Sequence, residues 1–241
     1  MLIEYVSVSR TKLWEECEQR YKFKYHLGIP SPEPEPEYFA YGKVIHKIIE
    51  LHTLGRGRVD INQASKDVLS GKVELEPGKK CPPLSLEYKR KLPDHLRSYM
   101  RLAEKIGTEG MVEWKFRIDM DPPHGRLMLG FIDRIIQKGD EFFILDWKTT
   151  KKGPWREDSH TIKDSLQLQT YCRVVQKEFK ADPKKIRAAL YFLDGGDLVG
   201  ANYTEATLDG LESKLVEAHK TIQAADPDRV LGRVGKHCSR C

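Results

Sequence analysis

Two neighbouring apolar segments of the chain end in charged residues: LGFID at residues 129–133 and FFILDWKTT at residues 142–150. Successive side chains of a strand point to opposite faces, so we expect Asp146 and Lys148 to lie side by side. Placing a carboxylate and an ammonium group together at the end of an apolar strand is costly for folding alone. The arrangement is explained if a divalent metal ion and a water molecule occupy that point.

The composition is that of an ordinary globular chain of 241 residues, enough for one large domain or two small ones. Hydrophobic residues make up 39%, charged residues make up 32%, and the formal net charge is +5. This mild basicity permits a nucleic-acid partner without requiring one. The sequence shows no secretion signal and no segment long enough to span a membrane. We therefore expect a cytoplasmic protein, or one of the host cytoplasm if it is viral, with no membrane partner.

The hydrophobic periodicity changes from helical to alternating near residue 110. Helices are expected at residues 9–26, 39–53, 84–106 (where Pro93 could introduce a break), 161–179 and 208–225. Strands are expected at residues 112–120, 126–137, 141–148, 186–193 and 198–203. The pattern predicts a single α/β domain. Its parts are a mainly helical region at 1–110 with a variable insertion at 55–83, a sheet core at 111–205, and a helix and cysteine tail at 206–241.

The two charged strand ends are candidate metal ligands. Asp133 and Asp146 end adjacent antiparallel strands and could bind one cation, and carboxylates with water suit Mg²⁺ or Mn²⁺. Lys148 could orient or help deprotonate a water molecule, or balance charge at a phosphate, and Glu113 could lie nearby. The alternative is that Asp146 and Lys148 form only a surface ion pair, because short motifs of this kind recur by chance.

Two more pairs of residues accompany these strands. Gly42 and His46 are about one helical turn apart, and Gln167 and Tyr171 share one face of the helix that follows the second strand. Taken singly, His46 could be a hydrogen-bonded histidine on a helix surface. Gln167 and Tyr171 could be ordinary packing residues between a helix and the sheet.

In this order the motifs closely resemble the PD-(D/E)xK nuclease superfamily, in particular the branch with the RecB nuclease domain, AddB-like subunits and CRISPR-associated adaptation exonucleases. The matching motifs are Gly42-x-x-x-His46, Gly130-x-x-Asp133, Asp146-x-Lys148 and Gln167-x-x-x-Tyr171. The likeness extends from about residue 7 to the C-terminus. It implies a restriction-endonuclease-like core, with a mixed central sheet flanked by helices.

The resemblance implies metal-dependent hydrolysis of DNA phosphodiester bonds. The metal ligands that it implies for Mg²⁺ or Mn²⁺ are His46, Asp133, Asp146 and the backbone carbonyl of Trp147. Lys148 would be the catalytic lysine, and Gln167 and Tyr171 would orient Lys148 or the nucleic-acid backbone. Basic and aromatic residues that directly follow the catalytic strand could bind a single strand, or form only a solvated loop. These residues are Lys151, Lys152, Trp155 and Arg156.

We expect an exonuclease, alone or with some endonuclease activity, that prefers single-stranded DNA or DNA ends. Its context would be recombination, DNA repair, phage DNA processing or CRISPR adaptation, with protein partners from such a complex. The alternative is a DNA-binding subunit of a larger complex, with an idle or auxiliary nuclease site. An RNA substrate is a third, weaker alternative, because nothing in the sequence indicates recognition of a 2′-hydroxyl group.

The cysteines suggest a second cofactor. The five cysteines are Cys17, Cys81, Cys172, Cys238 and Cys241, an odd number that argues against a disulfide framework. In the iron–sulfur members of the family that the chain resembles, one N-terminal and three C-terminal cysteines hold a 4Fe–4S cluster. Cys17, Cys238 and Cys241 match three of these positions, and the fourth ligand is not seen in this chain.

Several alternatives to a four-cysteine cluster are open. Another ligand, such as His237, Cys172 or Cys81, could complete the cluster, or the cluster could be absent. Cys17, His237, Cys238 and Cys241 could instead bind zinc, and the bland alternative is a frayed tail with free thiols. We favour a structural cluster that pins the C-terminal tail to the first helix.

Overall fold

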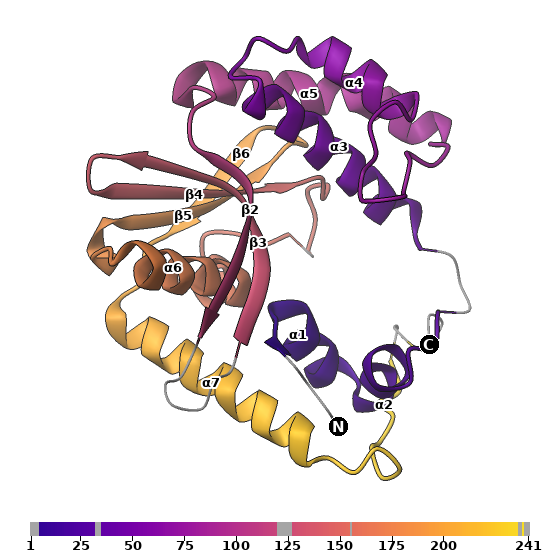
Figure 1. Cartoon of the computed structure of the whole chain (residues 1–241), viewed down its shortest axis with the longest axis vertical. Helices are drawn as coiled ribbons and strands as arrows, with labels where there is room; N and C mark the ends of the chain where they lie inside the picture. Colours follow the sequence, from indigo (N-terminus) through magenta and orange to yellow (C-terminus); the bar gives the residue numbers. More distant parts are fainter. Residues whose placement is uncertain (1–4, 32–34, 120–126, 155, 236–237, 239–241) are drawn as a thin grey trace.

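In the computed structural model, the described residues are 5–31, 35–119, 127–154, 156–235 and 238. They form an α/β fold in which a six-stranded mixed sheet lies between helices (Figure 1). The expected sheet flanked by helices is confirmed. The strands are β1 (Tyr5–Val6), β2 (Met111–Asp119), β3 (Leu127–Lys138), β4 (Glu141–Lys148), β5 (Ile186–Phe192) and β6 (Asp197–Ala201).

The order of the sheet is β1-β3-β4-β5-β6, with β2 on the second edge of β3. β3 and β4 form the expected antiparallel hairpin, and β4 and β5 are parallel. β2 pairs with β3 along most of its length, from Leu127 to Ile135. On its other edge, β3 pairs with β1 only at Leu127 and Met128, and with β4 only from Arg134 onward. Among the described residues, 129–133 therefore have no strand partner on that edge. We call this segment the open edge of β3.

The helices cover both faces of the sheet. They are α1 (Val8–Glu16), α2 (Glu18–Tyr21), the π-helix η1 (Lys22–His26), α3 (Glu37–Leu54), α4 (Ile61–Leu69), α5 (Leu86–Ile106), α6 (Leu166–Phe179) and α7 (Glu205–Ala224), with short 3₁₀ turns at η2 (Thr161–Asp164) and η3 (Pro183–Lys185). One buried core lies between the sheet and α6 and α7, and includes Leu168 and Leu211. The other lies between the sheet and α3, α4 and α5, and includes Ile45 and Trp147. These apolar faces explain the two layers of helices in Figure 1.

The first helix differs from the expected helix at residues 9–26. Its N-cap is Ser7, before the expected start at residue 9, and the Ser7 hydroxyl accepts a hydrogen bond from the Arg10 backbone N–H at 3.3 Å. The helix breaks at Cys17, where φ is −165° and ψ is 112°. This extended residue turns the chain into α2 and places the Cys17 side chain, 3% exposed, inside the fold.

The segment at 55–83, expected to be a variable insertion, contains α4. Asp60 caps this helix, and its carboxylate accepts a hydrogen bond from the Asn62 backbone N–H at 2.9 Å. Ile61, Ala64 and Val68, at helical spacing, are buried in the core that α3 shares. Pro93 does not end α5, which continues to Ile106. Among the described residues, no helix is long and apolar enough to cross a membrane.

Candidate functional site

His46 reaches the sheet from the middle of α3. A Cβ added at Gly42, one turn before it, would lie 4.0 Å from Thr149 Oγ1, so this face of α3 passes close to the end of β4. The Nε2–H group of His46 donates a hydrogen bond to the Trp147 carbonyl at 3.1 Å. The imidazole therefore reaches the backbone oxygen that the family resemblance implies as a metal ligand.

Two carboxylates lie on the other side of the imidazole ring. His46 Nδ1 is 3.4 Å from Glu113 Oε1 and 3.6 Å from Asp133 Oδ2. The Trp147 backbone N–H donates to Asp133 Oδ2 at 2.8 Å, which fixes this carboxylate beside β4. Ligand atoms of His46, Glu113 and Asp133 all lie within 4.8 Å of one another. One nitrogen and several oxygen ligands at this spacing suit a small divalent cation.

Glu113 has an unusual backbone conformation. Its φ is 45°, in the left-handed region that residues with a side chain rarely adopt. The ladder pairs Val112 with Arg134 and Trp114 with Ile132, and skips Glu113 and Asp133 between them. The distortion of β2 accompanies the placement of the Glu113 carboxylate beside His46.

Lys148 lies in a second group of contacts, on the α6 side of β4. Its ammonium group is 2.6 Å from Asp146 Oδ2 and donates a hydrogen bond to Gln167 Oε1 at 3.0 Å. Gln167 Nε2 donates to Asp146 Oδ1 and to the Tyr171 hydroxyl, each at 2.7 Å. The Tyr171 hydroxyl also donates to Asp146 Oδ1 at 3.4 Å. Gln167 therefore fixes the direction of the lysine and the carboxylate together.

Gly130 affects the contacts of Lys148, Asp146, Gln167 and Tyr171 indirectly, through the packing of Phe116. A Cβ added at Gly130 would lie 2.4 Å from the Phe116 ring, so only glycine leaves room for that ring. Phe116 in turn packs edge-on against Tyr171, with ring centroids 6.5 Å apart. A larger residue at position 130 would displace Phe116 and so disturb its contact with Tyr171, which contacts Asp146.

In the cluster of His46, Glu113 and Asp133, the electrostatics favour bound protons at the place where a cation would bind. Burial alone would lower the pKa of His46, but Asp133, Glu113 and Asp146 outweigh it and raise the pKa from 6.5 to about 9. Burial and the neighbouring carboxylates raise the pKa of Asp133 from 3.8 to about 7. The imidazolium thus supplies positive charge among carboxylates. A divalent ion would replace that charge, with release of protons.

Lys148 and Tyr171 stay protonated at neutral pH. Burial would lower the pKa of Lys148, but the carboxylates of Asp146 and Asp133 raise it above the usual 10.5. Burial and the same carboxylates raise the pKa of the Tyr171 hydroxyl well above 10. With its pKa raised, Lys148 can act as a positively charged donor but is poorly suited to act as a base.

The sequence of the chain matches the PD-(D/E)XK nuclease superfamily over residues 5–241. The chain belongs to the PD-(D/E)XK nuclease superfamily. A crystal structure of a candidate exonuclease from Eubacterium rectale is similar in fold, with a TM-score of 0.59 and 14% identity, over 99% of this chain and 86% of that one. The structure of SSO0001, also 14% identical, has a TM-score of 0.36 over 85% of this chain and 82% of that one, which is too low to support an argument. No curated protein matches the sequence significantly.

The remaining predicted residues of this nuclease fold have different surroundings. Lys151 and Lys152 are exposed beyond β4, and Lys151 lies 3.4 Å from Glu87. The Arg156 side chain is only 8% exposed, stacks over the Phe192 ring at 3.8 Å and pairs with Asp197 at 2.6 Å. Its charge is therefore already compensated within the fold. Trp155 lies outside the described residues.

The cysteine tail of the nuclease returns to the first helix, as the cluster hypothesis requires. The Arg233 backbone N–H donates to Cys17 Sγ at 3.5 Å, and Cys238 Sγ donates to the Arg233 carbonyl at 3.6 Å. Cys238 Sγ also accepts from the Gly235 N–H at 3.2 Å. Two thiols from opposite ends of the chain thus contact one residue. Cys241 and His237 lie outside the described residues. Cys172 is buried in the core under α6 and α7, and Cys81 is half-buried against the other core.

Glu113 also belongs to the cluster of His46 and Asp133, although the sequence indicated only that it could lie near the other carboxylates. Glu113 contacts His46, and it stands opposite Asp133 in the register of β2 and β3. Its carboxylate at the start of a strand was the only available signal. Its left-handed backbone could not have been predicted, because glycine and asparagine are the residues that usually mark this conformation.

Proposed function

We propose that the chain is a Mg²⁺- or Mn²⁺-dependent deoxyribonuclease that hydrolyses phosphodiester bonds of single-stranded DNA or DNA ends. The observation that supports it most is the position of Lys148 Nζ. It lies 2.6 Å from Asp146 and is held by Gln167, next to the cluster of His46 and Asp133. A module that only binds DNA has no need of a half-buried lysine fixed against a buried carboxylate in this way.

The residues of the chain have separate tasks in this reaction. The metal would be held by His46, Asp133, Asp146 and the Trp147 carbonyl, with the Glu113 carboxylate as a further ligand beside His46. When bound, it lowers the pKa of a water molecule and neutralises charge at the phosphate. Lys148, kept protonated, orients the attacking water and donates to the phosphate oxygens as negative charge builds on them. Gln167 and Tyr171 hold Lys148 and Asp146 in the required directions.

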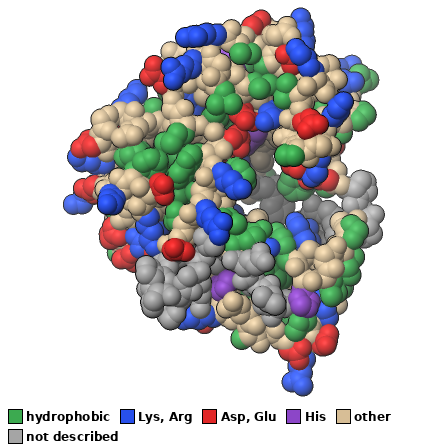
Figure 2. Space-filling view, in the orientation of Figure 1, with side chains coloured by type: hydrophobic (Ala, Val, Ile, Leu, Met, Phe, Trp, Pro, Cys, Tyr) green, Lys and Arg blue, Asp and Glu red, His purple; other side chains and the backbone are tan. Residues whose placement is uncertain are grey.

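We further propose that the enzyme is an exonuclease, with some endonuclease activity, of the RecB, AddB and CRISPR-associated branch. Lys151 and Lys152, exposed beyond the catalytic strand, would bind the phosphate backbone. Lys and Arg side chains also border the hollow at the centre of the face in Figure 2. The contexts that suit such an enzyme are recombination, repair, phage DNA processing and CRISPR adaptation, within a cytoplasmic protein complex.

We also propose a structural 4Fe–4S cluster between the tail and the first helix. Its support is the approach of Cys17 and Cys238 to Arg233, and the backbone N–H groups that point at both sulfur atoms. Hydrogen bonds of this kind stabilise thiolate ligands of metal clusters. Cys241 would be a third ligand, and the donor that completes the set is not identified by the described residues.

The test of the nuclease function is digestion of DNA labelled at the 5′ or the 3′ end, with Mn²⁺ and with EDTA. Metal-dependent release of labelled products supports the proposal, and the two labels reveal the polarity of an exonuclease. Binding of labelled single strands without any cleavage would support the alternative of a DNA-binding subunit with an idle site.

A further inference from the structure

A cleft of about 560 Å³ lies beside the candidate active site. Its walls come from β1 and α1, from β2 and β3, and from α6. The lining includes Gln167 and Tyr171, so the cleft continues directly from the group that holds Lys148. It also includes Leu129, Gly130 and Phe131, which belong to the open edge of β3.

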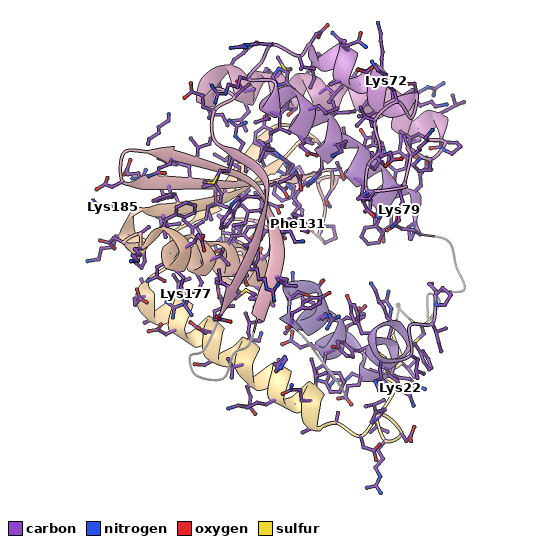
Figure 3. All side chains as sticks on the ribbon, in the orientation of Figure 1. Lys22, Lys72, Lys79, Phe131, Lys177 and Lys185 are labelled. Atoms are coloured by element: carbon purple, nitrogen blue, oxygen red, sulfur yellow. The ribbon has the colours of Figure 1, made fainter. Side chains whose placement is uncertain are left out.

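Phe131 is an exposed aromatic residue in this cleft. Its side chain is 53% exposed, whereas the neighbouring Ile132 is fully buried. Phe131 and Asp133 are two residues apart on β3, so their Cα atoms are separated by about 6 to 7 Å along the strand. Figure 3 labels Phe131 where β3 faces the space between α3 and α1. Exposure of a large aromatic ring this close to a catalytic carboxylate suggests a ligand that stacks on it.

Two exposed lysines also line the cleft. Lys115 pairs directly with Phe131 across β2 and β3, so the two side chains lie on the same face of the ribbon. Lys12 lines the cleft from α1. Both are exposed, and neither forms an ion pair within the part of the chain that the structure describes. An exposed aromatic ring in a cleft that also holds two lysines is a combination that binds a base and its flanking phosphates.

We propose that this cleft binds the unpaired DNA nucleotide next to the scissile phosphate, with its base stacked on Phe131 and phosphates paired with Lys115 and Lys12. The inference rests on the proposed function, and it identifies the residues that select single strands. In a duplex the faces of each base are covered by its neighbours, so Phe131 can stack only on a base that has left the helix. The open edge of β3 leaves Phe131 accessible to an extended single strand of DNA.

Binding without cleavage tests the inference separately from the nuclease function. The probe is a fluorescein-labelled oligothymidylate of about 12 nucleotides, measured by anisotropy in EDTA. We expect Phe131→Ala to weaken binding about ten-fold or more, as loss of one stacked base does. Phe131→Trp keeps the aromatic platform and should retain affinity. Leu198→Ala is the matched control, because Leu198 is 56% exposed on β6 at the far edge of the sheet.

Replacement of a cleft lysine should change the salt dependence of DNA binding. Loss of one phosphate contact in Lys115→Ala should reduce the slope of log K against log salt by about 0.7, the value for one phosphate of a single strand. Lys138→Ala, at the distant end of β3, should leave the slope unchanged. A 2-aminopurine base in the probe adds a direct signature, since stacking on Phe131 quenches its fluorescence and Phe131→Ala should restore it.

The outcomes separate the two proposals. Unchanged affinity and unchanged 2-aminopurine fluorescence in Phe131→Ala would overturn the inference, whether or not the enzyme cleaves DNA. The inference would also fail if the wild-type protein bound a blunt duplex as tightly as the single strand. Conversely, stacking on Phe131 in a protein that cleaves nothing with Mn²⁺ would support the single-strand binding cleft and refute the nuclease function.

Discussion

Glu113 stands opposite Asp133 in the register of β2 and β3, at the point where their ladder skips one pair. Glu113 has a φ of 45° there, and its carboxylate lies 3.4 Å from His46. A left-handed conformation costs a residue with a side chain about 1 to 2 kcal/mol. The cost is understandable if the carboxylate of Glu113 takes part in metal binding.

Replacement of Glu113 should therefore separate stability from metal binding. We expect Glu113→Gly to raise the melting temperature of the metal-free protein, because glycine adopts this φ without strain. The same variant should bind Mn²⁺ about 10- to 100-fold more weakly. Thermal melts in EDTA and calorimetric titration with Mn²⁺ measure the two effects. Equal Mn²⁺ affinity in Glu113→Gln and the wild type would show that Glu113 takes no part in metal binding.

Lys148→Ala tests the assignment of the catalytic lysine. We expect the rate of DNA cleavage to fall by about 100-fold or more, the usual loss of one charged donor at a transition state. Mn²⁺ affinity should be kept or increased, because Asp146 loses the cation 2.6 Å away. Asp133→Ala and Asp146→Ala should instead lose both cleavage and metal affinity. Lys138→Ala is the matched control, and normal cleavage by Lys148→Ala would contradict the assigned role.

The strands of the site could be predicted from sequence because their side chains alternate over a long stretch. The hairpin of β3 and β4, and the shared face of Asp146 and Lys148, follow from this period of two. The helix with Gln167 and Tyr171 follows in the same way from a period of four. Contact of His46 with Trp147 across 101 residues of chain was expected only through the resemblance to a nuclease family.

Other features depend on tertiary contacts that no local pattern encodes. Cys17 interrupts a segment with helical periodicity, because the fold buries its side chain at an extended residue. α4 was missed because glycines and polar residues surround its three buried side chains. The sequence left Arg156 open as a DNA contact or part of a solvated loop, and no local pattern indicates that Phe192 and Asp197, distant in sequence, contact its guanidinium.

Gln167 should behave as a positioning residue. Gln167→Leu removes the acceptor of Lys148 and the donors to Asp146 and Tyr171, so we expect kcat to fall about 10- to 100-fold. The KM for single-stranded DNA should change little. Tyr171→Phe should be milder, since its hydroxyl is 3.4 Å from Asp146 whereas Gln167 is 2.7 Å away. Steady-state kinetics on a labelled oligonucleotide distinguish these effects, and a change in KM alone would assign Gln167 to substrate binding.

The raised pKa values predict how stability depends on pH. A group whose pKa rises on folding stabilises the fold below its unfolded pKa, and this contribution is lost as the pH passes the folded pKa. The pKa of Asp133 rises from 3.8 to about 7 and that of His46 from 6.5 to about 9. Both groups therefore make the metal-free protein less stable as the pH rises from about 4 to 9.

Mn²⁺ should reverse the loss of stability with rising pH. The metal displaces the protons of His46 and Asp133, so its affinity rises over the same pH range. Thermal melts at about pH 5, 7 and 9, in EDTA and in Mn²⁺, measure both trends. The stability of the Asp133→Asn variant in EDTA should depend less on pH than that of the wild type. A stabilisation by Mn²⁺ that is the same at all three values would contradict the exchange of protons for metal.

The tail cysteines give the last prediction. If Cys17 and Cys238 hold an iron–sulfur cluster, the protein purified without oxygen should be brown and absorb at about 400 nm. Cys17→Ser and Cys238→Ser should be colourless and less stable, because the tail loses its attachment to the first helix. Cys172→Ser should stay brown, since Cys172 is 1% exposed in the core under α6 and burial raises its pKa to about 12. A colourless wild-type protein without iron would refute the cluster, and stoichiometric zinc in it would favour the zinc site instead.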